Sequence, residues 1–416
     1  MKPDTLAIHG GNGGDDAFGA SAVPIYQTVS YAYKSAQELA DVFDGKAPGY
    51  IYTRIANPTT AALESRLTEL EGGIGCIATS SGMAAIASVA AGLLRSGDEI
   101  VSASGIFGGT LSLFKNTLGR FGIKTRLVQA GKTGEFAKAV GKKTRLVFVE
   151  TIGNPRMDVP DIPAVAEIAH RANVPLIVDN TVTTPLLVRP GQFGADIVVH
   201  STSKFINGHG TAIGGAIIDT GRFNWGKGPF EEIRKTAQKA GQAAFLVYLR
   251  NLVYRDLGGC PAPLNSFLML QGLETLPVRM VRHCANAEKL AQYLRHNSKV
   301  HWVNYPGLPD SKFHDRTVKL FGGFGGALLT LSLGSKQRAF RFIDSLRLAV
   351  NLANLGDTRT LVIHPSSTIF HEFGEAEKAR MGVGEDMVRV SVGIEDFEDI
   401  RNDFEQAINK AYEEKK

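Results

Sequence analysis

The stretch that decides the fold runs from Ile197 to Ile218 and reads IVVHSTSKFINGHGTAIGGAII. It begins with Ile197–Val199, a short apolar run of β-branched residues that is typical of a buried strand. Hydroxyl residues, Lys204 and a glycine-rich segment follow at once. Open α/β sheets bind ligands beyond the carboxyl ends of their strands, so Lys204 stands where a ligand can reach it. A single lysine in a loop is more often a solvated surface residue, and the rest of the chain must decide between the two interpretations.

Short apolar strands alternate with helical patterns around this stretch. The alternation predicts an α/β fold, in which a parallel sheet is covered by helices on both faces. The expected strands are 76–79, 98–102, 125–128, 145–150, 175–178 and 197–199. Three of them end in polar side chains, which a parallel sheet brings to one edge. These are Glu150 with Asn154, Asp179 with Thr181, and Ser201 with Lys204.

A second candidate site follows the strand at 76–79, where the sequence reads Ser80-Ser81-Gly82-Met83. Apolar residues then recur at helical spacing from Ile86 to Leu93, so the four residues form a turn between a strand and a helix. Free backbone N–H groups and serine hydroxyls at such a helix N-terminus bind anions. A serine that only caps the helix is the simpler interpretation of this segment taken alone.

Composition and charge are those of an ordinary globular chain. Its 416 residues, 44% hydrophobic and 21% charged, exceed what a single core usually holds, so we expect two domains. A net charge of +5 without a dense Lys/Arg tract gives no indication of nucleic-acid binding. No apolar run approaches the ~20 residues that span a bilayer, and the N-terminus lacks an apolar signal core. Three cysteines without paired spacing favour reduced thiols in a cytoplasmic protein, and we expect no metal site.

Three parts of the chain differ in pattern. Residues 1–60 are rich in turn residues and aromatic side chains, with little helical period before 35–43, so we expect an extended arm that contacts a partner subunit. Residues 61–258 carry the alternation of strands and helices and form the large domain. Residues 259–416 predict a smaller α+β domain. Its expected elements are a long helix at 276–294, strands at 301–305, 327–333 and 387–392, and helices at 336–346 and from 396.

Asp179 and Lys204 together point to one kind of cofactor chemistry. A lysine amine can form a Schiff base with pyridoxal phosphate, and a buried carboxylate needs a cationic partner such as the protonated pyridine ring. The protonated ring stabilises a carbanion at the α-carbon of the substrate, and Asn154 can hydrogen-bond the ring hydroxyl. Taken alone, Asp179 would also suit a turn or a helix cap. The phosphate would lie at Ser81, Gly82 and Met83, with Ser201 and Ser203 completing its site.

Four motifs together resemble the Cys/Met-metabolism family of pyridoxal-phosphate enzymes. They are VDNTVTTP around Asp179, HSTSK around Lys204, SSGM at 80–83 and YTRIANPTT at 52–60. The resemblance runs over almost the whole chain. Three further stretches are similar to the O-acetylhomoserine sulfhydrylase branch of that family. They are NGHGTAIGGAIID at 207–219, RDLGGCPAPLNSFLMLQGLETLPVRM at 255–280 and LANLGDTRTLVIHPSST at 352–368.

The resemblance implies a fold and several roles. The fold is that of the fold type I transferases, which are aspartate-aminotransferase-like, with a large parallel or mixed sheet and a smaller α+β domain. Lys204 would hold the cofactor and shuttle protons, with Thr181 among the cofactor contacts. Tyr52 and Arg54 would reach the cofactor phosphate from a neighbouring subunit of a homo-oligomer, a tetramer by resemblance, and Tyr52 would also act on the substrate as an acid. The substrate carboxylate would bind Arg389, assisted by Asn354. Without the family, Arg389 would suit an edge-strand salt bridge.

One position departs from the family, which usually has tyrosine before Gly-Gly-Thr where this chain has Phe107. Phenylalanine can stack on the pyridine ring, but it has no hydroxyl for acid–base work. Acetate leaves Cγ readily as an anion, whereas a thiolate leaves better when it is protonated. Our hypothesis is that Phe107 favours replacement of acetate by sulfide over cleavage of a C–S bond, unless Tyr52 serves as the acid.

The activity that the resemblance implies is γ-replacement in methionine and cysteine biosynthesis. O-acetyl-L-homoserine with sulfide or methanethiol would give L-homocysteine or L-methionine, and acetate. The alternatives are a C–S lyase acting on methionine or cystathionine, an O-succinylhomoserine sulfhydrylase, and a binder that retains the cofactor site without turnover. A nicotinamide-dependent oxidoreductase would need GxGxxG after its first strand, and no such arrangement in the chain is convincing.

Overall fold

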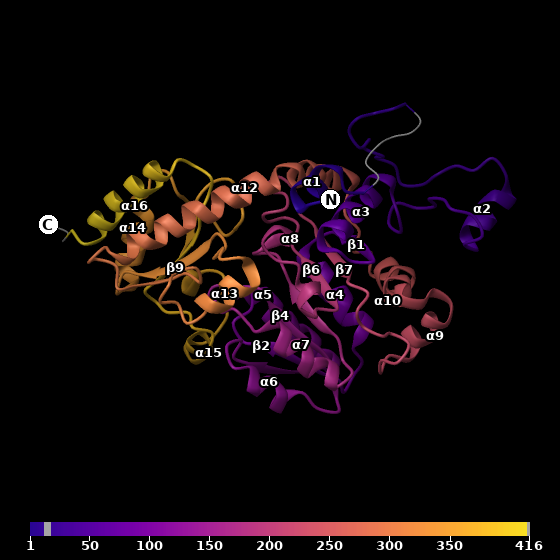
Figure 1. Cartoon of the computed structure of the whole chain (residues 1–416), viewed down its shortest axis with the longest axis horizontal. Helices are drawn as coiled ribbons and strands as arrows, with labels where there is room; N and C mark the ends of the chain where they lie inside the picture. The colour runs from indigo at the N-terminus through magenta and orange to yellow at the C-terminus, as the bar shows by residue number, and fades with distance from the viewer. Residues whose placement is uncertain (12–17, 414–416) are drawn as a thin grey trace.

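The computed structural model describes residues 1–11 and 18–413 and contains two sheets, each with its own hydrophobic core (Figure 1). The large sheet has seven strands in the order β1-β7-β6-β5-β4-β2-β3, and the small sheet has five in the order β10-β11-β12-β9-β8. The large sheet is made of β1 Gly75–Thr79, β2 Glu99–Ala103, β3 Lys124–Val128, β4 Thr144–Glu150, β5 Leu176–Asp179, β6 Ile197–His200 and β7 Gly215–Asp219. The small sheet is made of β8 Trp302–Asn304, β9 Leu328–Ser332, β10 Val350–Asn351, β11 Leu361–Ile363 and β12 Met387–Ser391.

Helices cover both faces of the large sheet, as the apolar strands predicted. Every residue of β2, β6 and β7 is buried, and successive residues of a strand point to opposite faces. The α-helices are α1 Pro3–His9, α2 Ala36–Phe43, α3 Pro58–Glu71, α4 Gly82–Leu93, α5 Gly108–Ser112, α6 Thr133–Ala139, α7 Ile162–Arg171, α8 Thr184–Leu187, α9 Glu231–Ala240, α10 Ala244–Tyr248, α11 Arg255–Leu257, α12 Pro263–Arg295, α13 His314–Phe321, α14 Lys336–Ser345, α15 Glu375–Arg380 and α16 Phe397–Ala411.

The large sheet is mixed, which corrects the expectation of a wholly parallel one. All six predicted strands are present. Five of them, β3, β2, β4, β5 and β6, are adjacent in the sheet and pair in parallel, whereas β1 pairs only with β7. β7 is antiparallel to both of its neighbours, β1 and β6. The glycine-rich segment after Lys204 lets the chain turn back beside β6 without a crossover helix, and Gly208 takes a φ of +76° there.

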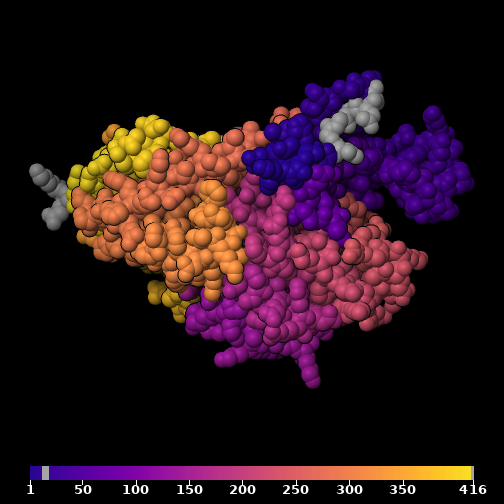
Figure 2. Space-filling model, viewed as in Figure 1, coloured from indigo at the N-terminus to yellow at the C-terminus, as the bar shows by residue number. Residues whose placement is uncertain are grey.

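Residues 1–60 are not extended throughout, which corrects a second expectation. α1 packs on α3 and α12 of the same chain and buries Leu6 and Ala7, a pair too short to show a helical period. The segment around α2 does project from the body of the molecule (Figures 1 and 2). α2 buries none of its residues, so this part of the arm finds no cover within its own chain.

The long helix of the C-terminal part begins earlier than the predicted residue 276. α12 starts at Pro263 and runs through Pro277 without ending. Proline removes one backbone hydrogen bond from a helix interior, but packing on both sides keeps this helix intact. Its first half joins the core of the large sheet and its last turns, with Leu290 and Leu294, join the core of the small sheet. The division of the chain at residues 258 and 259 therefore stays a prediction.

α12 also fixes the segment that follows Lys204. Gly272 lies so close to this segment that a Cβ atom would stand 2.6 Å from the carbonyl oxygen of Asn207, and closer still to that of Ile206. Arg279 donates hydrogen bonds to the carbonyl oxygens of Phe205 at 2.7 Å and Ile206 at 3.3 Å. The position of Lys204 thus depends on contact between α12 and the backbone of residues 205–207.

We expect Gly272→Ala to destabilise the protein by about 1–3 kcal/mol, because the methyl group meets backbone atoms that can yield only by moving the segment after Lys204. Gly134→Ala on α6 is the matched control, since a Cβ atom there meets nothing within 4 Å and alanine favours the helix. Thermal unfolding at one fixed scan rate compares the two. Equal midpoints for both variants would contradict the close approach of α12.

Candidate active site

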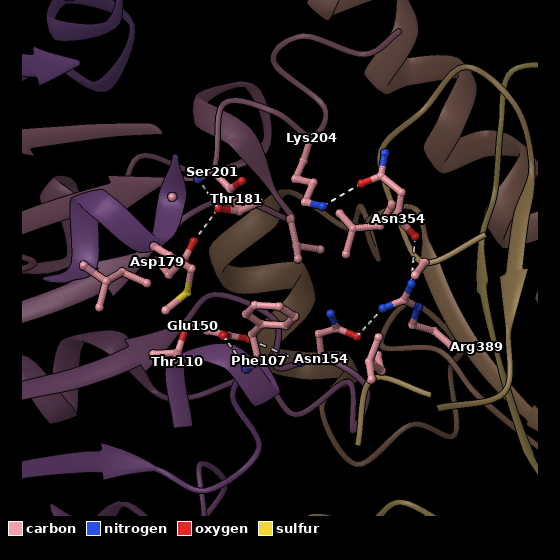
Figure 3. A pocket seen from close by; sticks show the side chains of 17 residues that line it. Phe107, Thr110, Glu150, Asn154, Asp179, Thr181, Ser201, Lys204, Asn354 and Arg389 are labelled. Carbon is pink, nitrogen blue, oxygen red and sulfur yellow. Dashed lines mark hydrogen bonds between the residues drawn. The ribbon is translucent and has the colours of Figure 1, made fainter. Parts of the chain in front are cut away.

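A cavity of about 790 Å³, including its open mouth, lies where β4, β5 and β6 end (Figure 3). The large sheet supplies most of its lining, and segments of the small domain close the opposite side. Ten of the predicted site residues line this one cavity. They are Gly82, Met83, Phe107, Asn154, Asp179, Thr181, Ser201, Lys204, Asn354 and Arg389. Ser81 and Ser203 line an adjoining hollow that shares Gly82, Met83, Ser201 and Lys204 with it.

Lys204 projects its amine into the cavity and donates a hydrogen bond of 2.6 Å to Oδ1 of Asn354 (Figure 3). Burial, and next the positive charge of Arg389, lower the pKa of the Lys204 amine to about 8. An amine with this pKa is largely unprotonated at mildly alkaline pH, which is the form that attacks a carbonyl. The solvated surface lysine considered above is therefore excluded for Lys204.

Asp179 ends β5 in the same cavity and has no cationic partner among the described residues. Its Oδ1 accepts a hydrogen bond of 2.9 Å from the backbone N–H of Thr181. The Thr181 hydroxyl in turn accepts one of 2.8 Å from the N–H of Ser201, which joins the ends of two strands. Burial raises the pKa of the Asp179 carboxyl, although the hydrogen bonds from Thr181 lower it. A carboxylate in this position is stabilised when a cation such as a pyridinium N–H enters the cavity.

The N-terminus of α4 forms an anion site beside Lys204. The N–H groups of Gly82 and Met83 lie in the first helical turn and have no acceptor within the helix. Ser81 caps the helix, since its hydroxyl accepts the N–H of Ala84 at 3.0 Å. A Cβ atom on Gly82 would stand 2.6 Å from Cβ of Ser201, so glycine allows the close approach. The cap and the anion site coexist on this turn.

Ser203 has a role that the sequence did not indicate. Its hydroxyl donates to the carbonyl oxygen of Gly214 at 3.1 Å and accepts the N–H of the same residue at 2.9 Å. The side chain thus holds the glycine-rich segment against the turn that carries Lys204. Its contact with a phosphate group stays a prediction.

Arg389 lies on β12 inside the small sheet, which corrects the edge-strand interpretation. It is buried, and it donates hydrogen bonds of 2.7 Å to the carbonyl oxygen of Asn354 and 3.2 Å to Oδ1 of Asn154. Its Nε atom has no partner among the described residues. Burial lowers the pKa of the guanidinium to about 10, so it stays charged at neutral pH. A buried guanidinium that bonds only to neutral oxygens and lines a cavity is a receptor for a carboxylate.

Two polar residues without an assigned role also line the cavity, Glu150 and Thr110. Glu150 accepts a hydrogen bond of 2.6 Å from the backbone N–H of Phe107. The Thr110 hydroxyl is buried and has no partner among the described residues. The position of Glu150 at a strand end was visible in the sequence, but its contact with a loop that lies 43 residues earlier was not.

Tyr52 and Arg54 do not reach the cavity of their own chain. The Arg54 guanidinium lies 5.3 Å from the centre of the Tyr52 ring, and its Nη1 donates to the carbonyl oxygen of Arg255. Tyr52 is 40% exposed. The structure thus brings together the residues predicted within one chain and leaves apart the two that were predicted to come from a partner.

These residues fit pyridoxal phosphate. An amine, an under-partnered buried carboxylate and a helix N-terminus line one connected space, and they match the aldehyde, the ring nitrogen and the phosphate of that molecule. Phe107 borders the space with its aromatic ring, which suits stacking on the pyridine. The described residues hold no group of three or more His, Cys, Asp or Glu side chains that would suit a metal ion.

We expect the apoenzyme to bind pyridoxal phosphate covalently at a rate that rises with pH through about 8, because only the unprotonated Lys204 amine attacks the aldehyde. Arg389→Met removes a positive charge that lowers the pKa of this amine, so the midpoint of the rate should move to higher pH. Stopped-flow absorbance measures the rate. Arg120→Met, at an exposed site outside the cavity, is the control and should leave the midpoint in place. If the rate had the same pH midpoint in the wild type and in Arg389→Met, Arg389 would not lower the pKa of the Lys204 amine.

Comparisons with known proteins agree with pyridoxal phosphate as the cofactor. The model of the family described as Cys/Met metabolism PLP-dependent enzyme matches residues 4–409. The chain is 42% identical to an O-acetyl-L-homoserine sulfhydrylase of Leptospira meyeri over 98% of this chain and 97% of that one. It is also 42% identical to a homocysteine/cysteine synthase of Saccharomyces cerevisiae over 98% of each.

A crystal structure from Campylobacter jejuni, assigned as an O-acetylhomoserine (thiol)-lyase, carries pyridoxyl-lysine monophosphate. It superposes with a TM-score of 0.94 and is 35% identical, with 98% of this chain and 100% of that chain covered. The likeness confirms the expected fold type I architecture, with a large mixed sheet and a smaller C-terminal sheet. The chain belongs to the Cys/Met-metabolism family of pyridoxal-phosphate-dependent enzymes.

Proposed function

We propose that the protein catalyses γ-replacement on O-acetyl-L-homoserine, in which sulfide displaces acetate and L-homocysteine is formed. With methanethiol the product would be L-methionine. The observation that carries the proposal is the near full-length identity of 42% to enzymes named for this reaction, together with a cavity that presents Lys204, Asp179 and Arg389 to one ligand. The reaction belongs to the biosynthesis of methionine and cysteine.

Arg389 would bind the α-carboxylate of the substrate. Its two hydrogen bonds to neutral oxygens of Asn354 and Asn154 hold the guanidinium in place at the wall of the cavity, and a guanidinium has five N–H donors, so others remain for a carboxylate. Asn354 assists by fixing this arginine and the lysine at once. The carboxylate thereby sets the α-carbon within reach of the Lys204 amine.

Lys204 would move the protons of the reaction. Pyridoxal phosphate, when bound, supplies an electron-withdrawing ring that stabilises negative charge at the substrate α-carbon. The Lys204 amine takes a proton from that carbon, and a second proton is lost from the β-carbon before acetate leaves the γ-carbon with its bonding electrons. Hydrosulfide adds at the γ-carbon, and protons return to the β- and α-carbons. Asp179 keeps the ring nitrogen protonated throughout.

Phe107 favours this replacement over cleavage of a C–S bond. Its ring lines the cavity and carries no hydroxyl, so it offers no proton to a departing thiolate. Acetate needs no such proton, because its conjugate acid is far stronger than a thiol. Cystathionine and methionine would therefore be poor substrates for elimination.

A homo-oligomer would complete the site. The arm around α2 exposes large apolar side chains, with Phe18, Val29 and Phe43 exposed by 92%, 62% and 65%. Apolar patches of this kind mark a surface that another chain covers. The same arm carries Tyr52 and Arg54, which lie outside the cavity of their own chain, so they would serve the phosphate of a partner. Two subunits are the minimum for this arrangement, and a tetramer is the assembly that we propose.

A cytoplasmic location is part of the proposal. All three cysteines, Cys76, Cys260 and Cys284, are free thiols, which suits a reducing compartment. Among the described residues, no helix is both long enough and apolar enough to cross a bilayer.

We expect the purified enzyme to form homocysteine fastest from O-acetylhomoserine and sulfide in a panel that also contains O-acetylserine and O-succinylhomoserine. Methionine and cystathionine, tested alone, should release 2-oxobutanoate slowly. Phe107→Tyr adds a hydroxyl at the cavity and should raise the rate of this release about tenfold or more. A positioned general acid typically accelerates a reaction by ~10²-fold or more. Phe107→Leu is the matched control, because it removes the aromatic ring without adding an acid.

One outcome would contradict the proposed reaction, and another would contradict the proposed substrate. Cleavage of cystathionine as fast as the consumption of O-acetylhomoserine by the wild type would make the protein a C–S lyase. A preference for O-succinylhomoserine would change the leaving group but keep the reaction.

The shared site can be tested with subunit hybrids. Arg54→Met and Lys204→Ala should each be inactive alone, while the hybrids purified after co-expression should have about one half of the wild-type activity, because each hybrid dimer holds one intact site of two. Activity per subunit after tandem-tag purification of the hybrids is the measurement. If Arg54 served its own chain, the hybrids would have no intact site and would remain inactive.

A further inference from the structure

Two carboxyl groups lie side by side at the floor of the cavity. Glu150 ends β4 and Asp179 ends β5, and the two residues are direct partners in the parallel ladder. Residues paired in this way point to the same face of the sheet, and both side chains line the cavity. The proposed reaction uses Asp179 and gives Glu150 no role.

Within the described residues, neither carboxyl forms an ion pair at 4 Å or less. Lys204 and Arg389 line the same cavity but bond to Asn354 and Asn154, and His200, on the neighbouring strand, bonds to Glu71. A bound pyridine ring brings one positive charge for one carboxylate. Two ionised carboxylates in this space would therefore leave one buried charge without compensation.

The hydrogen bonds of Glu150 distinguish its two oxygen atoms. Oε1 accepts the backbone N–H of Phe107 at 2.6 Å, whereas Oε2 faces the N–H of Asn154 at the long distance of 3.3 Å. A carboxylate would attract both donors strongly. The difference fits a carboxylic acid with its carbonyl oxygen toward Phe107 and its hydroxyl at Oε2. Burial, and next the charge of Asp179, raise the pKa of Glu150 well above its usual range.

The surroundings of the two acids differ, and the difference decides which of them keeps the proton. Both acids accept hydrogen bonds, Glu150 from Phe107 and Asn154 and Asp179 from Thr181. Asp179 also has His200 near it, and it would face the positive charge of the bound ring, which favours its ionised form. The proton shared between two neighbouring acids therefore belongs on Glu150 rather than on Asp179.

We propose that Glu150 is a positioning residue that stays protonated beside an ionised Asp179 and fixes Phe107 and Asn154 at the cofactor site. Its two hydrogen bonds join the loop after β2 to the loop after β4. Phe107 and Asn154 both border the space that the ring fills. Glu150 thus sets the tilt of the ring without contributing charge to it.

Infrared difference spectra of the holoenzyme test the protonation state directly. The carbonyl band of a protonated carboxyl should be present in the wild type and absent from Glu150→Gln, and the same result is expected without cofactor. Glutamine keeps a carbonyl oxygen for the N–H of Phe107, which is the shorter of the two hydrogen bonds, but its amide nitrogen cannot accept the N–H of Asn154. Visible circular dichroism of the bound cofactor should therefore change less than about twofold in Glu150→Gln.

Glu150→Leu keeps the volume and removes both acceptors. We expect it to weaken cofactor binding about tenfold, as the loss of a buried hydrogen bond to a backbone N–H predicts, and to reduce the visible circular dichroism at least twofold. Far-UV circular dichroism checks the fold. The proposal fails if Glu150→Gln leaves the infrared band intact, if it behaves like Glu150→Leu, or if Glu150→Leu matches the wild type. None of these readouts uses the amino-acid substrate, so they do not depend on the reaction proposed above.

Discussion

The active site depends on the burial of an amine and a carboxylate in one cavity, where neither has an ionic partner in the part of the chain that the structure describes. Water would solvate both groups, and the protein replaces that water with neutral donors and acceptors. Lys204 bonds to an amide oxygen, and Asp179 bonds to a backbone N–H. Each group is therefore displaced from its ordinary protonation equilibrium in the direction that favours a neutral form. A ligand that carries an aldehyde and a basic ring nitrogen would offset the free-energy cost of burying the amine and that of burying the carboxylate.

The backbone around these two groups is held by contacts from distant parts of the chain. Gly272 and Arg279 of α12 hold the segment after Lys204 from one side. Gly356 approaches from the other, where a Cβ atom would stand 2.6 Å from the backbone nitrogen of Phe205. Such contacts leave the lysine turn few conformations to sample, which suits a residue that must present its amine to a fixed ring.

Much of the large domain could be predicted from the sequence, because its strands are uniformly apolar and its functional residues stand at strand ends. The positions of Asp179, Ser201 and Lys204 needed only that rule, and all three line one cavity. Other features were not visible in local patterns. β7 follows glycines that can extend or turn, and α1 buries only Leu6 and Ala7, which is too short a signal for a periodic pattern.

The links between distant residues were also beyond the reach of the sequence. The hydrogen bond from Lys204 to Asn354 joins residues 150 positions apart, and that from Arg389 to Asn154 joins residues 235 apart. Pattern and spacing report neighbours along the chain, whereas these contacts arise only when two sheets meet. The family resemblance supplied Arg389 and Asn354 as site residues. It did not supply the manner in which Asn354 bonds to both charged side chains.

The path of α12 through both cores has an evolutionary consequence. Lys204 and Asp179, which we propose act on the α-carbon and the cofactor, follow strands of one sheet, while Arg389, which we propose binds the substrate carboxylate, belongs to the other. Mutations that tilt the small sheet on its shared helix can retune which side chain is accepted and still spare the machinery that activates it. Proteins with this arrangement can therefore change their amino-acid specificity during evolution while their catalytic residues stay unchanged.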